Sequence, residues 1–249
     1  MAAHIKKSGF LEALLRIMDE KHHWAWEYFS SGRLNKARLK IHFQHEYAVY
    51  VRDFPVFLSR ILGANPPLPV RRMLAENIYE EETGGLSLRE SHPELFLTMM
   101  EGLGFRRRDF EHVRLLPAAR TYRAWLERMS NHRHWVAAAA TLTIFVEGSV
   151  KDRKEILVPP EKKHPEEIET IIGLHPLVRY HGVPPSRMGL IRAHQMVEAG
   201  HRHDAYDMVI NYTPTELRQS VLTCVKKSLS LWLNYRDAVA EACGIKTPS

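Results

Sequence analysis

Three side chains that can bind a metal ion share one face of a predicted helix. In the segment LIRAHQMVEAGHRHDAYDMV, residues 190–209, they are His194, Glu198 and His201. At about 100° per residue, these positions fall within an arc of roughly 60°. The same face carries apolar residues such as Val197 and therefore points toward the core, where an unpaired polar group costs several kcal/mol. Some partner must therefore satisfy the polar groups of these three side chains.

The spacing of these residues is typical of metal sites in helix bundles, which use inward glutamates and Glu-x-x-His pairs. Glu198 and His201 form such a pair, and His194 adds a third donor one turn earlier. Residues 20–23 and 161–164 repeat the Glu-x-x-His spacing. The first of these pairs reads as an ordinary helix face, and the second lies in a lysine-rich, solvated loop.

Further donors must come from other helices. Glu147 follows the uncharged run 135–146, so its carboxylate is expected to be buried and to need a partner. Three consecutive acids, residues 80–82, precede a Gly-Gly break and a helix that opens on His92. The three acids could equally well be an ordinary acidic helix end, and His92 an ordinary histidine at the start of a helix. The residues alone leave open whether this segment supplies metal ligands.

The amino-acid composition excludes several classes of protein. The 249 residues are 45% hydrophobic and 26% charged, which suits a globular domain, and the net charge of +6 is scattered without a nucleic-acid motif. Cys224 and Cys243 are too few for a disulfide scaffold, a zinc ribbon or an iron–sulfur cluster, and they favour a cytoplasmic location. The longest apolar run has 12 residues, so neither a signal peptide nor a membrane span is expected.

Helical periodicity dominates, and no alternating run is long enough for a sheet, so the sequence predicts an all-α protein. Ser91–Glu94 and Thr213–Glu216 match the capping box that begins helices. The polar segment 151–167 reads as an exposed loop within one domain, packed as a bundle of seven to nine helices. The expected helices are 8–31, 35–63, 68–82, 92–103, 117–131, 133–153, 165–179, 186–211 and 214–242.

Taken together, these motifs resemble a known superfamily. The run NIYEEETG at 77–84, His92-Pro-Glu-Leu-Phe, Glu147 and His-x3-Glu-x2-His at 194–201 are similar in order and spacing to the haem-oxygenase-like diiron oxidases, relatives of thiaminase II and pyrroloquinoline-quinone synthase. The likeness covers most of the chain and implies a single haem-oxygenase-like helical domain over residues 1–249. By the family pattern the first ligand is Glu81, rather than Glu80 or Glu82. The implied metal ligands are Glu81, His92, Glu147, His194, Glu198 and His201.

The resemblance also implies an activity. The protein would be a non-haem diiron oxidase or oxygenase with two Fe(2+) per chain. It would activate dioxygen through a peroxo-diiron intermediate and oxidise a small organic substrate of the amino-acid or fatty-acid type. The expected setting is cytoplasmic biosynthesis, with no nucleic-acid or membrane partner and a possible homodimer.

The sequence departs from several branches of the superfamily. Thiaminase II needs a cysteine in the middle of the chain, but none precedes Cys224. The branch that forms p-aminobenzoate from its own side chains has tyrosines where Trp26 and His42 stand, which disfavours that branch too. Glu147-Gly148 resembles the alkene-forming fatty-acid decarboxylases. The alternatives are a cofactor-free or haem-binding member of the fold, with His23 as an axial ligand, and a non-catalytic metal-binding protein.

The sequence also offers candidate residues for the walls of a substrate pocket. An aromatic stripe in a helix bundle is a core feature more often than a pocket wall, and an arginine is more often solvated than bound to a ligand. Even so, Arg192 is a candidate partner for a substrate carboxylate. The candidate walls are Trp26, Phe43, Tyr47, Tyr50 and Phe145.

Overall fold

The chain folds entirely into helices and connecting loops. A computed structural model describes residues 6–158 and 163–246, apart from the side chains of Glu198 and Ala199, and these residues contain no strand. The all-α prediction is confirmed. The α-helices are α1 (Lys7–Asp19), α2 (Trp26–Ser30), α3 (Lys36–Glu46), α4 (Phe54–Gly63), α5 (Leu68–Thr83), α6 (His92–Gly102), α7 (Pro117–Ser130), α8 (Trp135–Ala139), α9 (Asp152–Leu157), α10 (Pro165–Leu174), α11 (Pro176–His181), α12 (Gly189–Tyr212) and α13 (Arg218–Ala242). Two π-helical segments, η1 (Tyr47–Val51) and η3 (Ala140–Glu147), and three 3-10 turns, η2 (Arg107–Phe110), η4 (Pro185–Arg187) and η5 (Thr215–Leu217), complete the order.

Several of the long helices predicted from the sequence are two or more shorter helices in the structure. The predicted helix 165–179 breaks at His175, whose extended backbone is what a residue before proline prefers. Ser91 caps α6 as predicted, because its Oγ accepts a hydrogen bond from the Glu94 amide at 3.4 Å. The cap predicted at Thr213 is wrong. Thr213 ends α12, where its hydroxyl donates to the Val209 carbonyl at 2.6 Å.

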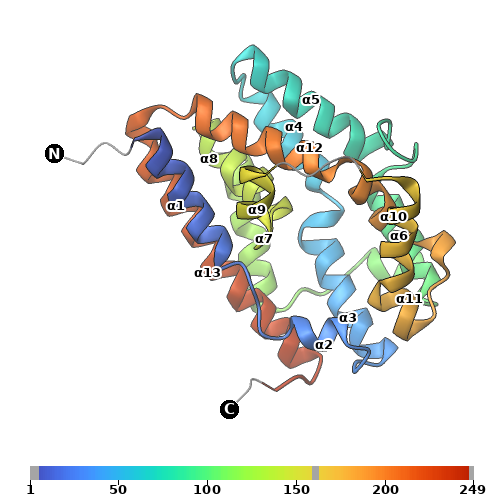
Figure 1. Cartoon of the computed structure of the whole chain (residues 1–249). Coiled ribbons are helices and arrows are strands. Elements are labelled where there is room, and N and C mark those ends of the chain that lie inside the picture. The colour runs from blue at the N-terminus through green and yellow to red at the C-terminus, as the bar shows by residue number, and fades with distance from the viewer. Residues whose placement is uncertain (1–5, 159–162, 247–249) are drawn as a thin grey trace.

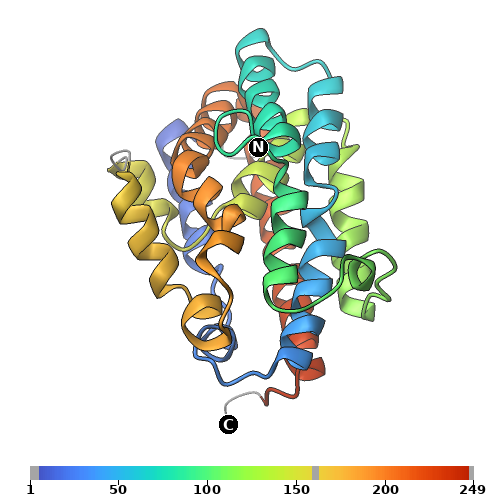
Figure 2. The same ribbon diagram turned by 90° about the vertical axis from the view of Figure 1, so that its right-hand side faces the viewer.

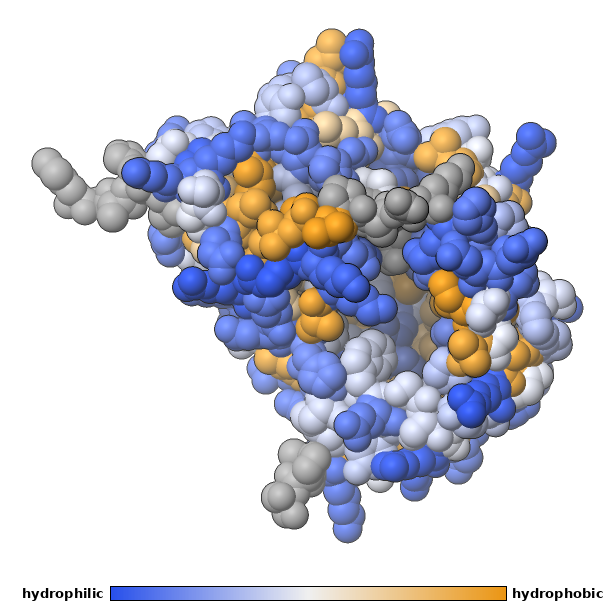
Figure 3. Space-filling view, viewed as in Figure 1, coloured by the Kyte–Doolittle hydropathy of each residue, from blue (hydrophilic) through white to orange (hydrophobic). Residues whose placement is uncertain are grey.

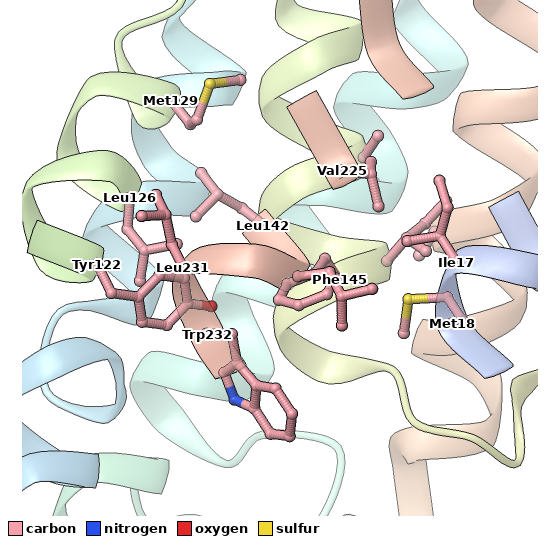
Figure 4. Close-up of a cluster of buried hydrophobic side chains, with 14 of the residues drawn as sticks. Ile17, Met18, Tyr122, Leu126, Met129, Leu142, Phe145, Val225, Leu231 and Trp232 are labelled. Carbon is pink, nitrogen blue, oxygen red and sulfur yellow. The ribbon is translucent and has the colours of Figure 1, made fainter. Parts of the chain in front are cut away.

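The larger hydrophobic cluster surrounds α13. Figures 1 and 2 show α13 running beside α1 and α7, and these helices and η3 contribute the side chains of the core in Figure 4. Leu126, Phe145 and Val225 are fully buried there. Each buried side chain of this size contributes about 1.5–3 kcal/mol. No helix in the described ranges is both long and apolar enough to cross a bilayer.

A second hydrophobic cluster lies on the other side of the molecule. It is built from α6, α10, α11 and the first turns of α12, with Phe96, Met99, Ile172 and Leu190 among its buried residues. The outer face seen in Figure 3 is mostly hydrophilic, with a hollow near its middle and hydrophobic side chains on both sides of that hollow. Helix α12 and segment η1 contribute residues to both clusters, so they connect the two halves.

One histidine is buried among aromatic rings. His42 on α3 is 4% exposed, and its ring centroid lies 4.3 Å from that of Phe29. Burial lowers the pKa of His42 well below its usual value, and the positive charges of Arg236 and His45 lower it further. The folded protein therefore holds this imidazole in its neutral form.

We expect the Leu126→Ala substitution to lower the free energy of unfolding by about 2–5 kcal/mol, because it leaves a cavity at a fully buried position. Urea unfolding followed by far-UV circular dichroism measures the change. The matched control is Leu174→Ala, whose side chain is 63% exposed and whose loss should change stability by less than about 0.5 kcal/mol. Equal effects at the two positions would contradict the assignment of the core.

We also expect the free energy of unfolding to fall as the pH drops below about 6.5, where an unfolded histidine takes up a proton that buried His42 does not. A depressed folded pKa contributes stability that is fully present above the unfolded pKa and lost below it, by up to about 1.4 kcal/mol per pH unit for one proton. Unfolding at several pH values should show a shallower slope for His42→Gln. The exposed His112→Gln control should keep the wild-type slope.

Candidate metal centre

Five of the six predicted ligand residues line one cavity of about 160 Å³. The cavity lies between the two hydrophobic clusters, with Phe54 from one and Leu190 from the other in its walls. Glu198 belongs to the same helix as two of the five, but its side chain lies outside the described residues. The five residues are Glu81, His92, Glu147, His194 and His201.

The turn after α5 brings the first two of these side chains together. Gly84 ends the helix with φ +59°, and its amide donates to the Glu80 carbonyl at 2.7 Å. A Cβ at Gly84 would lie 2.4 Å from the carbonyl oxygen of Glu90, so a larger residue would push the returning chain away. The tight turn lets α6 begin with His92 directly beside the end of α5.

His92 lies between two carboxylates. Its Nε2 is 3.1 Å from Glu80 Oε1, and its Nδ1 is 2.9 Å from Glu81 Oε1. Burial disfavours the charged imidazole, but the carboxylates of Glu81 and Glu80 outweigh it and raise the pKa of His92. Glu80 is fully buried and also accepts hydrogen bonds from the Leu86 amide and the Ser87 hydroxyl. The hydrogen bond to Glu80 orients the ring.

Only one of the three consecutive acids lines the cavity. Glu81 does so, whereas Glu80 bonds to the turn that follows and Glu82 is exposed. This arrangement agrees with the choice of Glu81 over its two neighbours. The assignment of Glu81 as a metal ligand stays a prediction.

The π-helical segment η3 carries Glu147 at its last position. The next residue, Gly148, stands where a Cβ would lie 2.3 Å from the Ile144 carbonyl oxygen, so glycine permits the sharp exit of the chain. Asn77 on α5 is 4% exposed, and its amide donates to Glu147 Oε1 at 3.1 Å. Asn77 and Glu81 are four residues apart on one helix face, so one helix supplies both a candidate ligand and the support for another.

Helix α12 supplies the histidines. His194 lies with its ring centroid 5.0 Å from that of His92. Burial, together with the charge of His92, lowers the pKa of His194 to about 4, and burial also lowers the pKa of His201. Both imidazoles are therefore neutral at pH 7, and neutral imidazole is the form that binds transition metals.

The donor set fits a metal cation. Within the described part of the chain, no group of three His, Cys, Asp or Glu side chains is arranged so that it could hold an ion as it stands. Two buried nitrogens of the cavity residues nevertheless lack a hydrogen bond in the described part of the chain. His201 Nε2 has no partner, and His92 Nδ1 has only the 2.9 Å ion-pair contact with Glu81, which does not have hydrogen-bond geometry. Buried nitrogens without a partner are costly, and a metal ion would satisfy both.

Several of the expected pocket residues lie elsewhere. Of the five aromatic residues expected to form the walls, only Tyr50 lines this cavity. Arg192 forms an ion pair with Glu169 through two nitrogens and does not line the cavity. His23 has both ring nitrogens engaged, with Asp237 at 3.0 Å and the Ala25 amide at 3.2 Å, so neither is available as an axial haem ligand in this arrangement.

Sequence reasoning missed the residues that support the candidate ligands. In the sequence analysis, Glu80 was considered only as an alternative ligand to Glu81, and Asn77 only as part of a motif. The four-residue spacing between Asn77 and Glu81 could have placed Asn77 on the same helix face as Glu81. The π-helical segments gave no signal in the apolar periodicity. Both contribute to the cavity, η1 through Tyr50 and Val51, and η3 through Val146 and Glu147, and π segments frequently occur at functional sites.

Similar solved structures define the class of fold. The structure of a TenA homolog from Pseudomonas syringae pv. tomato DC3000 matches with a TM-score of 0.66 and 15% identity, over 97% of this chain and 98% of that one. A domain of unknown function with a heme oxygenase-like fold from Shewanella denitrificans OS217 matches with a TM-score of 0.61 and 18% identity, over 95% and 88%. The chain has the haem-oxygenase-like fold.

The sequence then defines the family. Residues 41–233 match the model of the family described as iron-containing redox enzymes, and the chain belongs to that family. The matched region contains all six predicted ligand positions.

Curated relatives are named 4-aminobenzoate synthase. The protein of Chlamydia pneumoniae is 22% identical over 245 residues, which cover 96% of this chain and 100% of the relative. That of Chlamydia trachomatis serovar D is 32% identical over 79 residues, covering 30% of this chain and 34% of the relative. The expectation that Trp26 and His42 disfavour formation of p-aminobenzoate stays a prediction.

Gly200 offers a test of the helix that carries the histidines. A Cβ at Gly200 would meet nothing within 4 Å. We therefore expect Gly200→Ala to stabilise the metal-free protein by about 0.5–1 kcal/mol and to slow amide hydrogen exchange over residues 190–205. Gly182 is the matched control. It is equally uncrowded but has φ +68°, so Gly182→Ala should destabilise the protein. A destabilised Gly200→Ala protein would show that the helix needs this glycine.

Proposed function

We propose that the protein is an iron-dependent oxidase or oxygenase whose cavity binds two Fe(2+) ions. The ligands proposed are Glu81, His92, Glu147, His194, Glu198 and His201. The observation that carries the proposal is the convergence of five of these residues on one cavity, where two imidazole nitrogens lack hydrogen bonds among the residues described. Membership of the iron-containing redox family supports iron as the metal. Dioxygen and a small organic molecule would be the substrates.

The charges of the proposed ligands suit two ferrous ions. Glu81, Glu147 and Glu198 would supply three negative charges, which nearly balance two Fe(2+), while neutral histidines add nitrogen donors without further charge. When bound, the iron would supply the electrons that reduce dioxygen and allow it to oxidise the substrate. The chain's own contribution is to hold the donors and to exclude water.

Two contacts outside the ligand set would tune the site. Glu80 accepts from His92 Nε2, which leaves Nδ1 for the metal, and this carboxylate–histidine arrangement fixes the ring and raises its basicity. Asn77 restrains one oxygen of Glu147. The remaining walls, such as Val51, Phe54 and Val197, are apolar and keep the cavity dry.

Formation of 4-aminobenzoate is a second candidate activity, because the Chlamydia pneumoniae relative of that name matches over its full length. Trp26 and His42 argue against it if the reaction consumes tyrosines at these positions. Aerobic incubation of iron-loaded protein, followed by mass spectrometry for 4-aminobenzoate, distinguishes the two activities.

Substitution of the proposed ligands tests the iron site. Anaerobic loading with Fe(II) should give about two irons per wild-type chain, and His194→Ala or Glu147→Ala should lose most of this iron and the oxygen uptake that depends on it. Far-UV circular dichroism should stay nearly unchanged. The exposed residues His164 and His203 provide the controls, and their alanine variants should load normally. A fully loaded and active Glu147→Ala protein would refute the assignment.

A further inference from the structure

The end of η3, where Glu147 stands, is bonded to a lysine from a distant part of the chain. The Nζ atom of Lys21 donates to the carbonyl oxygens of Phe145 at 2.5 Å, Val146 at 3.2 Å and Gly148 at 2.6 Å. An ammonium group carries three hydrogens, so three converging carbonyl groups suit it. These carbonyl groups lie on both sides of Glu147 in the chain, and Lys21 therefore bonds to the backbone around a proposed iron ligand.

The backbone that carries Lys21 is anchored on both sides. Its amide donates to the Met18 carbonyl at 3.0 Å, in the last turn of α1. Shortly after it, His23 Nε2 lies 3.0 Å from Asp237 Oδ1, and the Trp24 indole donates to the same oxygen at 2.9 Å. Asp237 belongs to α13. The ammonium group is thus attached to α1 and α13, and not to the helix whose carbonyl groups it binds.

The other π-helical segment that lines the metal cavity has a similar contact. In η1, the Ala48 and Val49 carbonyl oxygens accept hydrogen bonds from Arg123 Nη1 at 3.3 and 3.2 Å. Arg123 lies on α7. π-Helical segments are rare, and a contact that favours one over an α-helix needs to come from its surroundings. In both segments a basic side chain from another element provides such a contact.

The hydrogen bonds of Lys21 depend on the helical register of η3. In a π-helix each residue turns the chain by a smaller angle than the 100° of an α-helix. If η3 became α-helical at its present length, its last residues would be rotated by about 100°. The carbonyl groups of Phe145 and Val146 would then turn away from Lys21 Nζ, and the side chain of Glu147 would turn away from the cavity. The same rotation breaks both sets of contacts.

We propose that Lys21 is a positioning residue that keeps η3 in its π-helical register and thereby keeps Glu147 directed into the metal cavity. A lysine in the last turn of its own helix would stabilise the end of that helix in any register. Lys21 instead lies 124 residues before Phe145, so its position does not turn with the helix and its hydrogen bonds select one register. The use of Glu147 as an iron ligand rests on the proposed function, whereas the control of register does not.

The Lys21→Met substitution tests this role, because it keeps the length of the side chain and removes the ammonium group. The crystal structure of the metal-free variant should show η3 with α-helical hydrogen bonds and Glu147 outside the cavity. In anaerobic titration with Fe(II), iron binding should weaken by about ten-fold or more. Lys151→Met is the matched control. It removes an exposed lysine four residues after Glu147 and should leave both the register and the iron affinity unchanged.

Deletion of Ala140 provides a second design. Ala140 is the first residue of η3, so the deletion keeps the sequence from Thr141 onward intact. The shortened segment would direct Glu147 into the cavity as an α-helix, without the extra residue of the π-helix. The deletion variant should bind iron as the wild type does. Adding Lys21→Met to it should then change iron affinity by less than about two-fold. This comparison also decides the question if the single Lys21→Met variant does not fold.

Two results would overturn the proposal. The first is an unchanged π-helical register in folded Lys21→Met protein. The second is an equal loss of iron affinity from Lys21→Met in the full-length and the shortened backgrounds, because Lys21 would then act on the site by a route other than the register of η3.

The register of the metal-free protein separates this proposal from the function proposed above. If wild-type protein takes up no iron but η3 becomes α-helical in Lys21→Met protein, the iron-oxidase proposal fails and the role of Lys21 stands. If wild-type protein takes up iron and Lys21→Met leaves both the register and the iron affinity unchanged, the opposite holds.

Discussion

The buried cavity between the two hydrophobic clusters imposes the main physical constraint on this fold. Glu81, Glu147 and three histidines approach one another where little water is available to solvate them. Such a group of carboxylates and imidazoles is costly unless a cation or a set of hydrogen bonds compensates it. The chain provides some compensation through Asn77 and Glu80. The helices that carry the group are distant in sequence, so packing of the two clusters must hold them together.

The sequence predicted the helical class and most of the cavity, because amphipathic periodicity and Glu-x-x-His spacing are local properties. It did not predict the supporting contacts. Which ring nitrogen of His92 faces Glu80 depends on the turn at Gly84, and the pairing of Arg236 with Glu46 joins residues far apart in the chain. The locations of the aromatic side chains were still harder to predict. Trp26 and Phe43 carry the same apolar signal whether they line a cavity or fill the core, so pattern alone could not assign them.

The π-helical form of η3 lets the segment hold one residue more without changing the direction in which Glu147 points. An i→i+5 segment holds one residue more than the corresponding α-helical turns, because each residue turns the chain by a smaller angle. Loss of one residue between Ala140 and Val146, with relaxation of the segment to an α-helix, would therefore leave the following side chain in nearly the same direction. If the segment were α-helical at its present length, Glu147 would instead be rotated by about 100° and would leave the cavity. In related sequences, the counterpart of Glu147 could therefore stand one position nearer to the start of this helix and still face the centre.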